Sequence, residues 1–138
     1  MSTVPTALSD SACDLVYEDV KFGIVRRVRW VATIGATGAC TLVAARSSVN
    51  TTITRTSTGL YAVTFGGAGA KSIVGMGGNI ENDDTSPTTS DARIVTGAAF
   101  DLGAGTGNIL TTAGDDGDVA DPTSGTTLYF SLDISCDT

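Results

Sequence analysis

The stretch Leu128–Cys136 reads Leu-Tyr-Phe-Ser-Leu-Asp-Ile-Ser-Cys, and apolar and polar residues alternate along it. Successive side chains of a β-strand point to opposite faces of its sheet, so this pattern predicts a strand with one buried and one solvated face. The expected inward residues are Leu128, Phe130, Leu132, Ile134 and Cys136, and the expected outward residues are Tyr129, Ser131, Asp133 and Ser135. Such a strand is typical of an antiparallel sheet that covers a core.

The same alternation recurs towards the N-terminus. Within residues 22–34 it places Phe22, Ile24, Val28, Trp30, Ala32 and Ile34 on one face, and only Arg26 interrupts that face. Shorter alternating segments predict strands at residues 40–44, 49–53, 60–65, 72–76, 92–102 and 108–112. In the fourth of these we expect Gly77-Gly78-Asn79 to end the strand, and in the fifth we expect Ala92, Ile94, Thr96, Ala98, Phe100 and Leu102 to share the core face.

Eight or nine short strands separated by turn residues indicate an all-β fold, an antiparallel β-sandwich. The chain has 138 residues, 17 of them glycine and 3 proline, which fits one domain with many tight turns. We prefer a jelly-roll topology of two four-stranded sheets, and an immunoglobulin-like sandwich remains open.

The N-terminal residues lack this alternation. We therefore expect an extended arm at residues 1–20, followed by the sandwich domain at residues 21–138. The apolar residues Val4, Leu8, Leu15 and Tyr17 could anchor the arm on a partner, and the alternative is a frayed terminus without a role.

The chain contains no histidine and only three cysteines, Cys13, Cys40 and Cys136. It thus lacks the usual side chains for proton transfer, nucleophilic activation and metal capture, and the cysteine spacing is no disulfide framework. The run Gly66–Ser72 resembles a phosphate-binding loop, but Ala70 stands where that motif needs glycine. We expect no enzyme activity, no cofactor and no catalytic residue.

The formal net charge is −7 and the isoelectric point is near 4.2, so we expect neither a nucleic-acid nor a membrane partner. Arg26, Arg27 and Arg29 form a basic cluster in which Arg27 and Arg29 would share a strand face. These two arginines could dock an acidic partner, or they could simply be solvated. The acidic segment 115–121 is expected to be a solvated loop rather than a calcium site, although its four carboxylates leave calcium open.

Residues 1–10 carry neither a basic region nor a long apolar run, so we find no secretory signal and expect synthesis in the cytoplasm.

Two longer phrases resemble small structural proteins of tailed bacteriophages. One is the segment 53–65, Ile-Thr-Arg-Thr-Ser-Thr-Gly-Leu-Tyr-Ala-Val-Thr-Phe, and the other is the segment 121–132, Asp-Pro-Thr-Ser-Gly-Thr-Thr-Leu-Tyr-Phe-Ser-Leu. With the turn at residues 35–38, the resemblance spans about residues 22–136 and leaves the arm unmatched. It implies a jelly-roll or tumour-necrosis-factor-like sandwich that decorates a capsid, often as a trimer, and it brings no catalytic residues.

The resulting hypothesis is a virion structural protein, made in the host cytoplasm and located on the capsid surface. It would be a capsid decoration (cement) protein, a homotrimer whose partner is the major capsid protein, with Val4, Leu8, Leu15, Tyr17, Arg27 and Arg29 as docking residues. One alternative is a tail, head-fibre or spike component. Another is a carbohydrate-binding module, for which Tyr17, Trp30 and Tyr129 are the candidate aromatic platform.

Overall fold

The computed structural model describes residues 14–19, 23–66, 70–82 and 92–136. Within these ranges, nine strands and two short 3-10 turns account for the regular structure. The strands are β1 (Asp14–Asp19), β2 (Gly23–Ile34), β3 (Cys40–Leu42), β4 (Thr52–Ser57), β5 (Leu60–Thr64), β6 (Ala70–Glu81), β7 (Arg93–Asp101), β8 (Thr106–Ala113) and β9 (Thr127–Cys136), and the turns are η2 (Ala36–Gly38) and η3 (Ala44–Arg46). No helix in the described part of the chain is long and apolar enough to cross a membrane.

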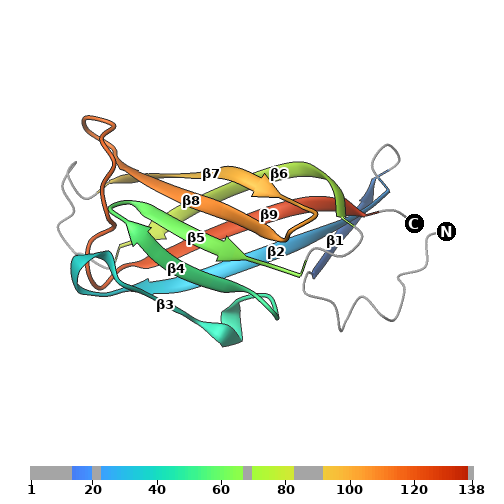
Figure 1. Cartoon of the computed structure of the whole chain (residues 1–138), viewed down its shortest axis with the longest axis horizontal. Coiled ribbons are helices and arrows are strands. Elements are labelled where there is room, and N and C mark those ends of the chain that lie inside the picture. The colour runs from blue at the N-terminus through green and yellow to red at the C-terminus, as the bar shows by residue number, and fades with distance from the viewer. Residues whose placement is uncertain (1–13, 20–22, 67–69, 83–91, 137–138) are drawn as a thin grey trace.

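The strands form two antiparallel sheets that pack face to face (Figure 1). The larger sheet has the order β1-β2-β9-β6, with β3 pairing with β2 as a fifth strand, and the smaller sheet has the order β4-β5-β8-β7. This arrangement confirms the prediction of an all-β antiparallel sandwich. Consecutive strands pair as hairpins β4–β5 and β7–β8 within the smaller sheet, and this strand order does not confirm a jelly roll.

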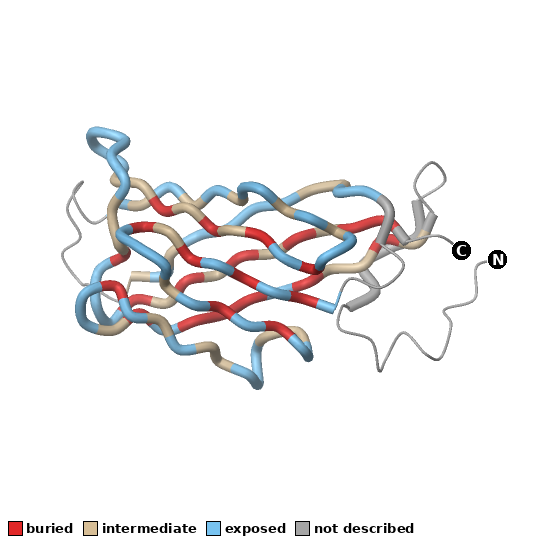
Figure 2. Tube along the Cα trace, in the orientation of Figure 1, coloured by how far each residue is buried: buried red, intermediate tan, exposed pale blue. Residues whose placement is uncertain are grey.

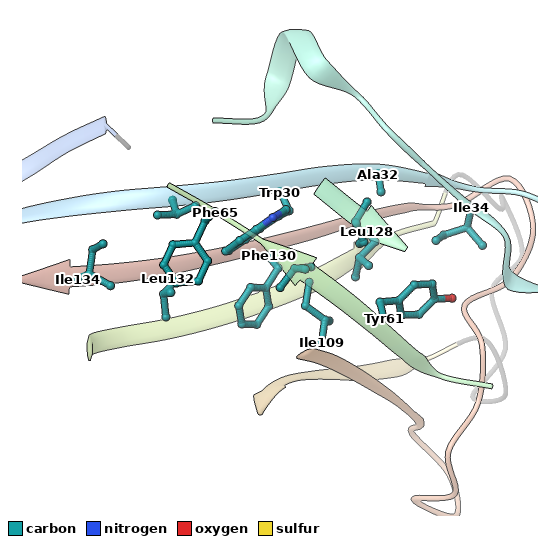
Figure 3. Close-up of a cluster of buried hydrophobic side chains, with 13 residues drawn as sticks. Trp30, Ala32, Ile34, Tyr61, Phe65, Ile109, Leu128, Phe130, Leu132 and Ile134 are labelled. Atoms are coloured by element: carbon teal, nitrogen blue, oxygen red, sulfur yellow. The ribbon is translucent and has the colours of Figure 1, made fainter. Parts of the chain in front are cut away.

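The core lies between the sheets and is built by the predicted alternation (Figures 2 and 3). Every second residue of β2 and β9 points inward, and the pairing Trp30 opposite Phe130 joins the two strands at the centre of the sheet. The residues confirmed as buried by this alternation are Val28, Trp30, Ala32, Ile34, Leu128, Phe130, Leu132 and Ile134. Tyr61, Val63 and Phe65 of the opposite layer, in the segment predicted as a strand at residues 60–65, meet them.

Four aromatic rings occupy the middle of this core. Trp30 packs edge-on against Phe65, and Phe100 stacks on Phe130, with ring centroids 5.8 and 5.9 Å apart. The indole Nε1 of Trp30 donates a hydrogen bond to the carbonyl oxygen of Thr64 at 3.1 Å, which satisfies its polar atom inside the core. This cluster ties the two sheets together.

The predicted end of β6 is wrong. The strand does not stop before Gly77 but continues through Gly77 and Gly78 to Glu81. Gly78 points inward, where a Cβ would lie 2.5 Å from the carbonyl oxygen of Tyr129 and 2.8 Å from the ring of Phe130. Glycine is needed here for close packing under an aromatic ring, not for a turn.

The predicted face of β7 is also wrong over its first half. Ile94 is 54% exposed, whereas Val95 packs against the core. A β-bulge between Ala98 and Asp101, with Ala99 at a φ of 52°, shifts the alternation by one residue, so that Phe100 again points inward. A bulge adds one residue to one strand, and the apolar pattern alone did not place it.

The segment expected as an N-terminal arm contains a strand. β1 pairs with β2 in the larger sheet, with Asp14 opposite Arg27 and Asp19 opposite Gly23. Residues 14–19 therefore belong to the sandwich rather than to an extended arm, while Val4 and Leu8 lie outside the described residues. No side chain of β1 is described, including those of Leu15 and Tyr17.

Candidate functional site

The outer face of the larger sheet carries the basic residues of β2. Arg27 and Arg29 alternate with the core residues of that strand and lie opposite Asp133 and Ser131 of β9. Arg27 Nε donates to Asp133 Oδ1 at 2.8 Å and its Nη2 donates to Oδ2 at 3.1 Å. This two-pronged ion pair fixes the orientation of the Arg27 guanidinium on the sheet surface.

Arg26 points to the opposite side of the strand from Arg27 and Arg29. Its backbone lies opposite Ile134, a core residue of β9, and its side chain is partly buried. Among the described residues, its Nε has no hydrogen-bond partner. The basic cluster of the sequence is thus divided between two faces, as the alternation rule requires.

Beside β9, the outer face of the larger sheet contains two glycines of β6. Gly75 and Gly77 of β6 lie opposite Asp133 and Ser131. A Cβ built on either glycine would meet no atom within 4 Å, so the space above this part of the sheet is open. The two glycines therefore lower the surface between the outward side chains of β9 and the edge of the sheet.

The connection between β3 and β4, which contains η3, borders this face beside β2. Val43 N donates to the carbonyl oxygen of Val31 at 2.7 Å, and Ser47 Oγ accepts from the amide of Val31 at 3.0 Å. These bonds hold η3 against the edge of β2. The sequence predicted strand up to residue 44, so it did not predict this turn.

The turn brings a third arginine to the outer face. The guanidinium of Arg46 lies 5.0 Å from the centroid of the Tyr129 ring, and its Nη2 donates to the Tyr129 hydroxyl at 2.7 Å. That hydroxyl donates in turn to Glu81 Oε2 at 2.5 Å. A cation over a ring, joined to a hydrogen-bond relay, holds both side chains in one arrangement.

These parts form one continuous depression, here called the arginine groove. It is defined by Arg27, Arg29, Arg46, Tyr129, Ser131, Gly75 and Gly77. Three adjoining hollows of about 330, 160 and 350 Å³ make it up; the first two share Arg27, Gly77 and Ser131, and the last two share Arg29 and Tyr129. The groove is open to solvent along its length, so it can hold a segment or side chains of a partner rather than enclose a small molecule.

The groove is unusually positive for this protein. The chain has 8 basic and 15 acidic residues. Three of the eight basic residues line the groove. Among the side chains that the structure describes, the acids beside them are Asp133, paired with Arg27, and Glu81, bonded to Tyr129, and the backbone of Asp14 in β1 lies opposite Arg27. Guanidinium groups at a surface depression can bind carboxylates through paired, charge-assisted hydrogen bonds.

A second polar cluster surrounds Asp121 at one end of the sandwich. Its Oδ1 accepts hydrogen bonds from Arg55 Nε at 3.0 Å and from the amide of Gly59 at 2.8 Å, and its Oδ2 accepts from Arg55 Nη2 at 2.7 Å. The Arg55 guanidinium lowers the pKa of the Asp121 carboxyl below its usual range. Tyr61 donates to the carbonyl oxygen of Gly38 at 3.0 Å, and burial raises the pKa of its hydroxyl.

This cluster bears on the calcium alternative for residues 115–121. Both Asp121 oxygens are engaged with donors of the protein, and Asp115, Asp116 and Asp118 are exposed. Among the described residues, no group of three or more His, Cys, Asp or Glu side chains is placed to hold a metal ion. Asp121 therefore connects Arg55 of β4 and the amide of Gly59 before β5 with the segment before β9.

The predicted site residues are only partly brought together. Arg27 and Arg29 lie in the groove. Of the arm anchors, Val4 and Leu8 lie outside the described residues, and the backbones of Leu15 and Tyr17 lie in β1, opposite Arg26 and Val25. Of the candidate carbohydrate platform, Trp30 is 1% exposed and is taken up by the core. Comparison with known proteins finds no match for this chain among protein-family models, curated proteins or solved structures.

Proposed function

We propose that this chain is a virion structural protein, a capsid decoration (cement) protein that binds the outer surface of a major capsid protein. The observation that carries the proposal is the arginine groove: a preorganised positive depression on the outer face of a sheet, in a protein of net charge −7. A positive depression on a protein of net negative charge favours docking of an acidic partner in a defined orientation.

The mechanism would be mechanical. A sandwich whose layers are joined by buried aromatic rings resists deformation, so it can bridge neighbouring subunits and add contact area across their joint. A stable protein interface buries about 800 Å² on each partner, so surface around the arginine groove must contribute as well. Repetition over a whole shell multiplies a modest energy at each site.

The proposal includes a homotrimer, for which the edges of the sheets offer support. β6 and β7 end their sheets and lie against each other, and the exposed apolar residues Ile73, Met76 and Ile94 belong to these two strands. The chain carries no charged residue between positions 72 and 80 or between 94 and 100. Uncharged edges with exposed apolar residues are suited to pairing with further copies, and closed symmetry would cover them.

The test is co-sedimentation with capsids assembled without this protein. We expect saturable binding of the purified chain and a rise in the temperature at which the capsids open. A tail, head-fibre or spike component would bind assembled tails or fibres instead, and a carbohydrate-binding module would bind an immobilised glycan. No binding to capsids, together with either of these results, would refute the proposed function.

A further inference from the structure

We infer that the arginine groove recognises an extended, carboxylate-bearing polypeptide segment. This inference rests on the proposed function only in naming the source of the segment, which is an acidic surface strand or tail of the capsid subunit. The chemistry of the segment is argued from the groove itself.

The charge of the groove suits such a segment. Arg27, Arg29 and Arg46 come from two separate parts of the chain and meet along one line of hollows. A guanidinium presents a planar fork of donors that matches both oxygens of a carboxylate. Asp133 already accepts from Nε and Nη2 of Arg27, so the positive charge of the three guanidinium groups, rather than a row of unoccupied forks, makes the groove complementary to a segment with repeated glutamate or aspartate.

The shape of the groove also suits an extended segment. The groove follows β9 from Asp133 to Tyr129, which at a rise of about 3.3 Å per residue is roughly 13 Å. An extended segment of about four residues has the same length. Because Gly75 and Gly77 have no side chains and the space above them is open, the main chain of such a segment can approach the sheet closely.

Two of the arginine side chains of the groove are held in place before any partner binds. Asp133 holds Arg27 through two bonds, and the ring and hydroxyl of Tyr129 hold Arg46. Side chains already fixed in place lose less freedom when a partner binds. Asp133 and Glu81 also disfavour binding of a nucleic acid in the groove, since their carboxylates and the net charge of −7 repel phosphates.

The experiment measures binding of a fluorescent peptide, in which glutamate alternates with serine, to the full chain by anisotropy at low salt. The reference is the same peptide with glutamine in place of glutamate. We expect acid-dependent binding that weakens about tenfold in Arg29→Gln and that Arg29→Lys partly restores, because losing one charge-assisted contact changes affinity by about this factor.

Two glycine-to-leucine variants test the shape of the groove without changing any charge. Gly77→Leu should fill the groove and abolish binding without loss of fold, because its Cβ meets no atom within 4 Å. The matched control is Gly103→Leu in the β7–β8 turn, where a Cβ would approach only Asp101 Oδ1, at 3.4 Å, and binding should be unchanged. Circular dichroism on each variant establishes that it is folded.

Several results would overturn the inference. They are equal binding of the glutamate and glutamine peptides, unchanged binding by Gly77→Leu, or tighter binding of a single-stranded oligonucleotide. Self-association that Arg29→Gln abolishes would make the occupant a second copy of this chain. Peptide binding without capsid binding would refute the proposed function alone, and capsid binding unaffected by Arg29→Gln and Gly77→Leu would refute this inference alone.

Discussion

At the scale of single residues, Asp121 connects more of the fold than any other acid of the described chain. Its carboxylate accepts hydrogen bonds from the Arg55 guanidinium and from the amide of Gly59. Its backbone oxygen accepts a hydrogen bond from Arg93 Nε at 3.0 Å. Gly38 must stay glycine for the same reason, since a Cβ there would lie 2.3 Å from Cγ of Asp121 and φ is +76°. The charge of Asp121 should therefore matter for stability.

We predict that the protein loses stability in acid through this carboxylate. The folded state holds the pKa of Asp121 below the ordinary value of 3.8, mainly through its hydrogen bonds with Arg55. The stabilisation is present above the ordinary pKa and is lost as the pH falls through the lowered one. Asp121→Asn should lower the thermal midpoint by several degrees at pH 7 and should flatten its fall below pH 4, as followed by circular dichroism.

Tyr61→Phe is the control for this pH dependence. It removes the hydrogen bond to the carbonyl oxygen of Gly38 and a longer one, of 3.4 Å, to Asp121 Oδ1, but no charge, so most of its cost of about 1 kcal/mol in urea unfolding should persist from pH 7 to pH 3. A Tyr61→Phe loss that disappears in acid, or an Asp121→Asn variant with the native pH profile, would contradict the assignment.

At the scale of elements, β6 distinguishes the two kinds of glycine that a strand can hold. Gly78→Ala should destabilise the protein by about 1–3 kcal/mol, because its Cβ would press on Tyr129 and Phe130. The neighbouring Gly77→Ala should be neutral or stabilising by up to about 1 kcal/mol, because its Cβ meets nothing and alanine restricts the unfolded chain. Guanidinium unfolding measures both, and equal losses would show that β6 does not pack as described.

The elements also show what the sequence could predict. Alternation was sufficient for the core face of β2 and β9, since both strands are long and that face is covered, but it did not predict the burial of Val25, Val31 and Ser135 on the other face. It failed at Gly77 and Gly78, where glycine serves close packing, and at Ala99, where a bulge shifts the alternation of β7.

The arginine groove, too, could be predicted only in part from the sequence. The shared face of Arg27 and Arg29 follows from the strand period. Arg46 could not be placed, because it reaches Tyr129 only through a turn held by hydrogen bonds between distant segments. Two outward glycines spaced by two residues, Gly75 and Gly77, were a usable signal once β6 is taken as a continuous strand.

At the scale of the whole molecule, the open sides of the two sheets predict self-association. We expect analytical ultracentrifugation to give three times the chain mass of 13.9 kDa. Met76→Lys and Ile94→Lys should yield monomers with unchanged stability, because both side chains are exposed and lie on the edge strands. Val49→Lys, an equally exposed change away from those edges, is the control, and its trimer should persist.

The arm and the groove make separate contributions that deletion can distinguish. Removal of residues 1–12 leaves every described strand in place, so the thermal transition should be nearly unchanged. If Val4 and Leu8, the two anchors that this deletion removes, dock on the capsid, attachment should weaken. If the truncated chain binds as well as the full chain, docking rests on the sandwich. The readout is a binding isotherm on capsids beside that of Arg29→Gln.

The most direct test of the account is a density map of capsids decorated with the full chain. The account predicts that the outer face of the larger sheet lies against the shell, with an acidic segment of the capsid subunit along β9 and carboxylates in contact with Arg29. A map in which this face is turned to solvent, or in which the chain does not occupy the capsid at all, would contradict it.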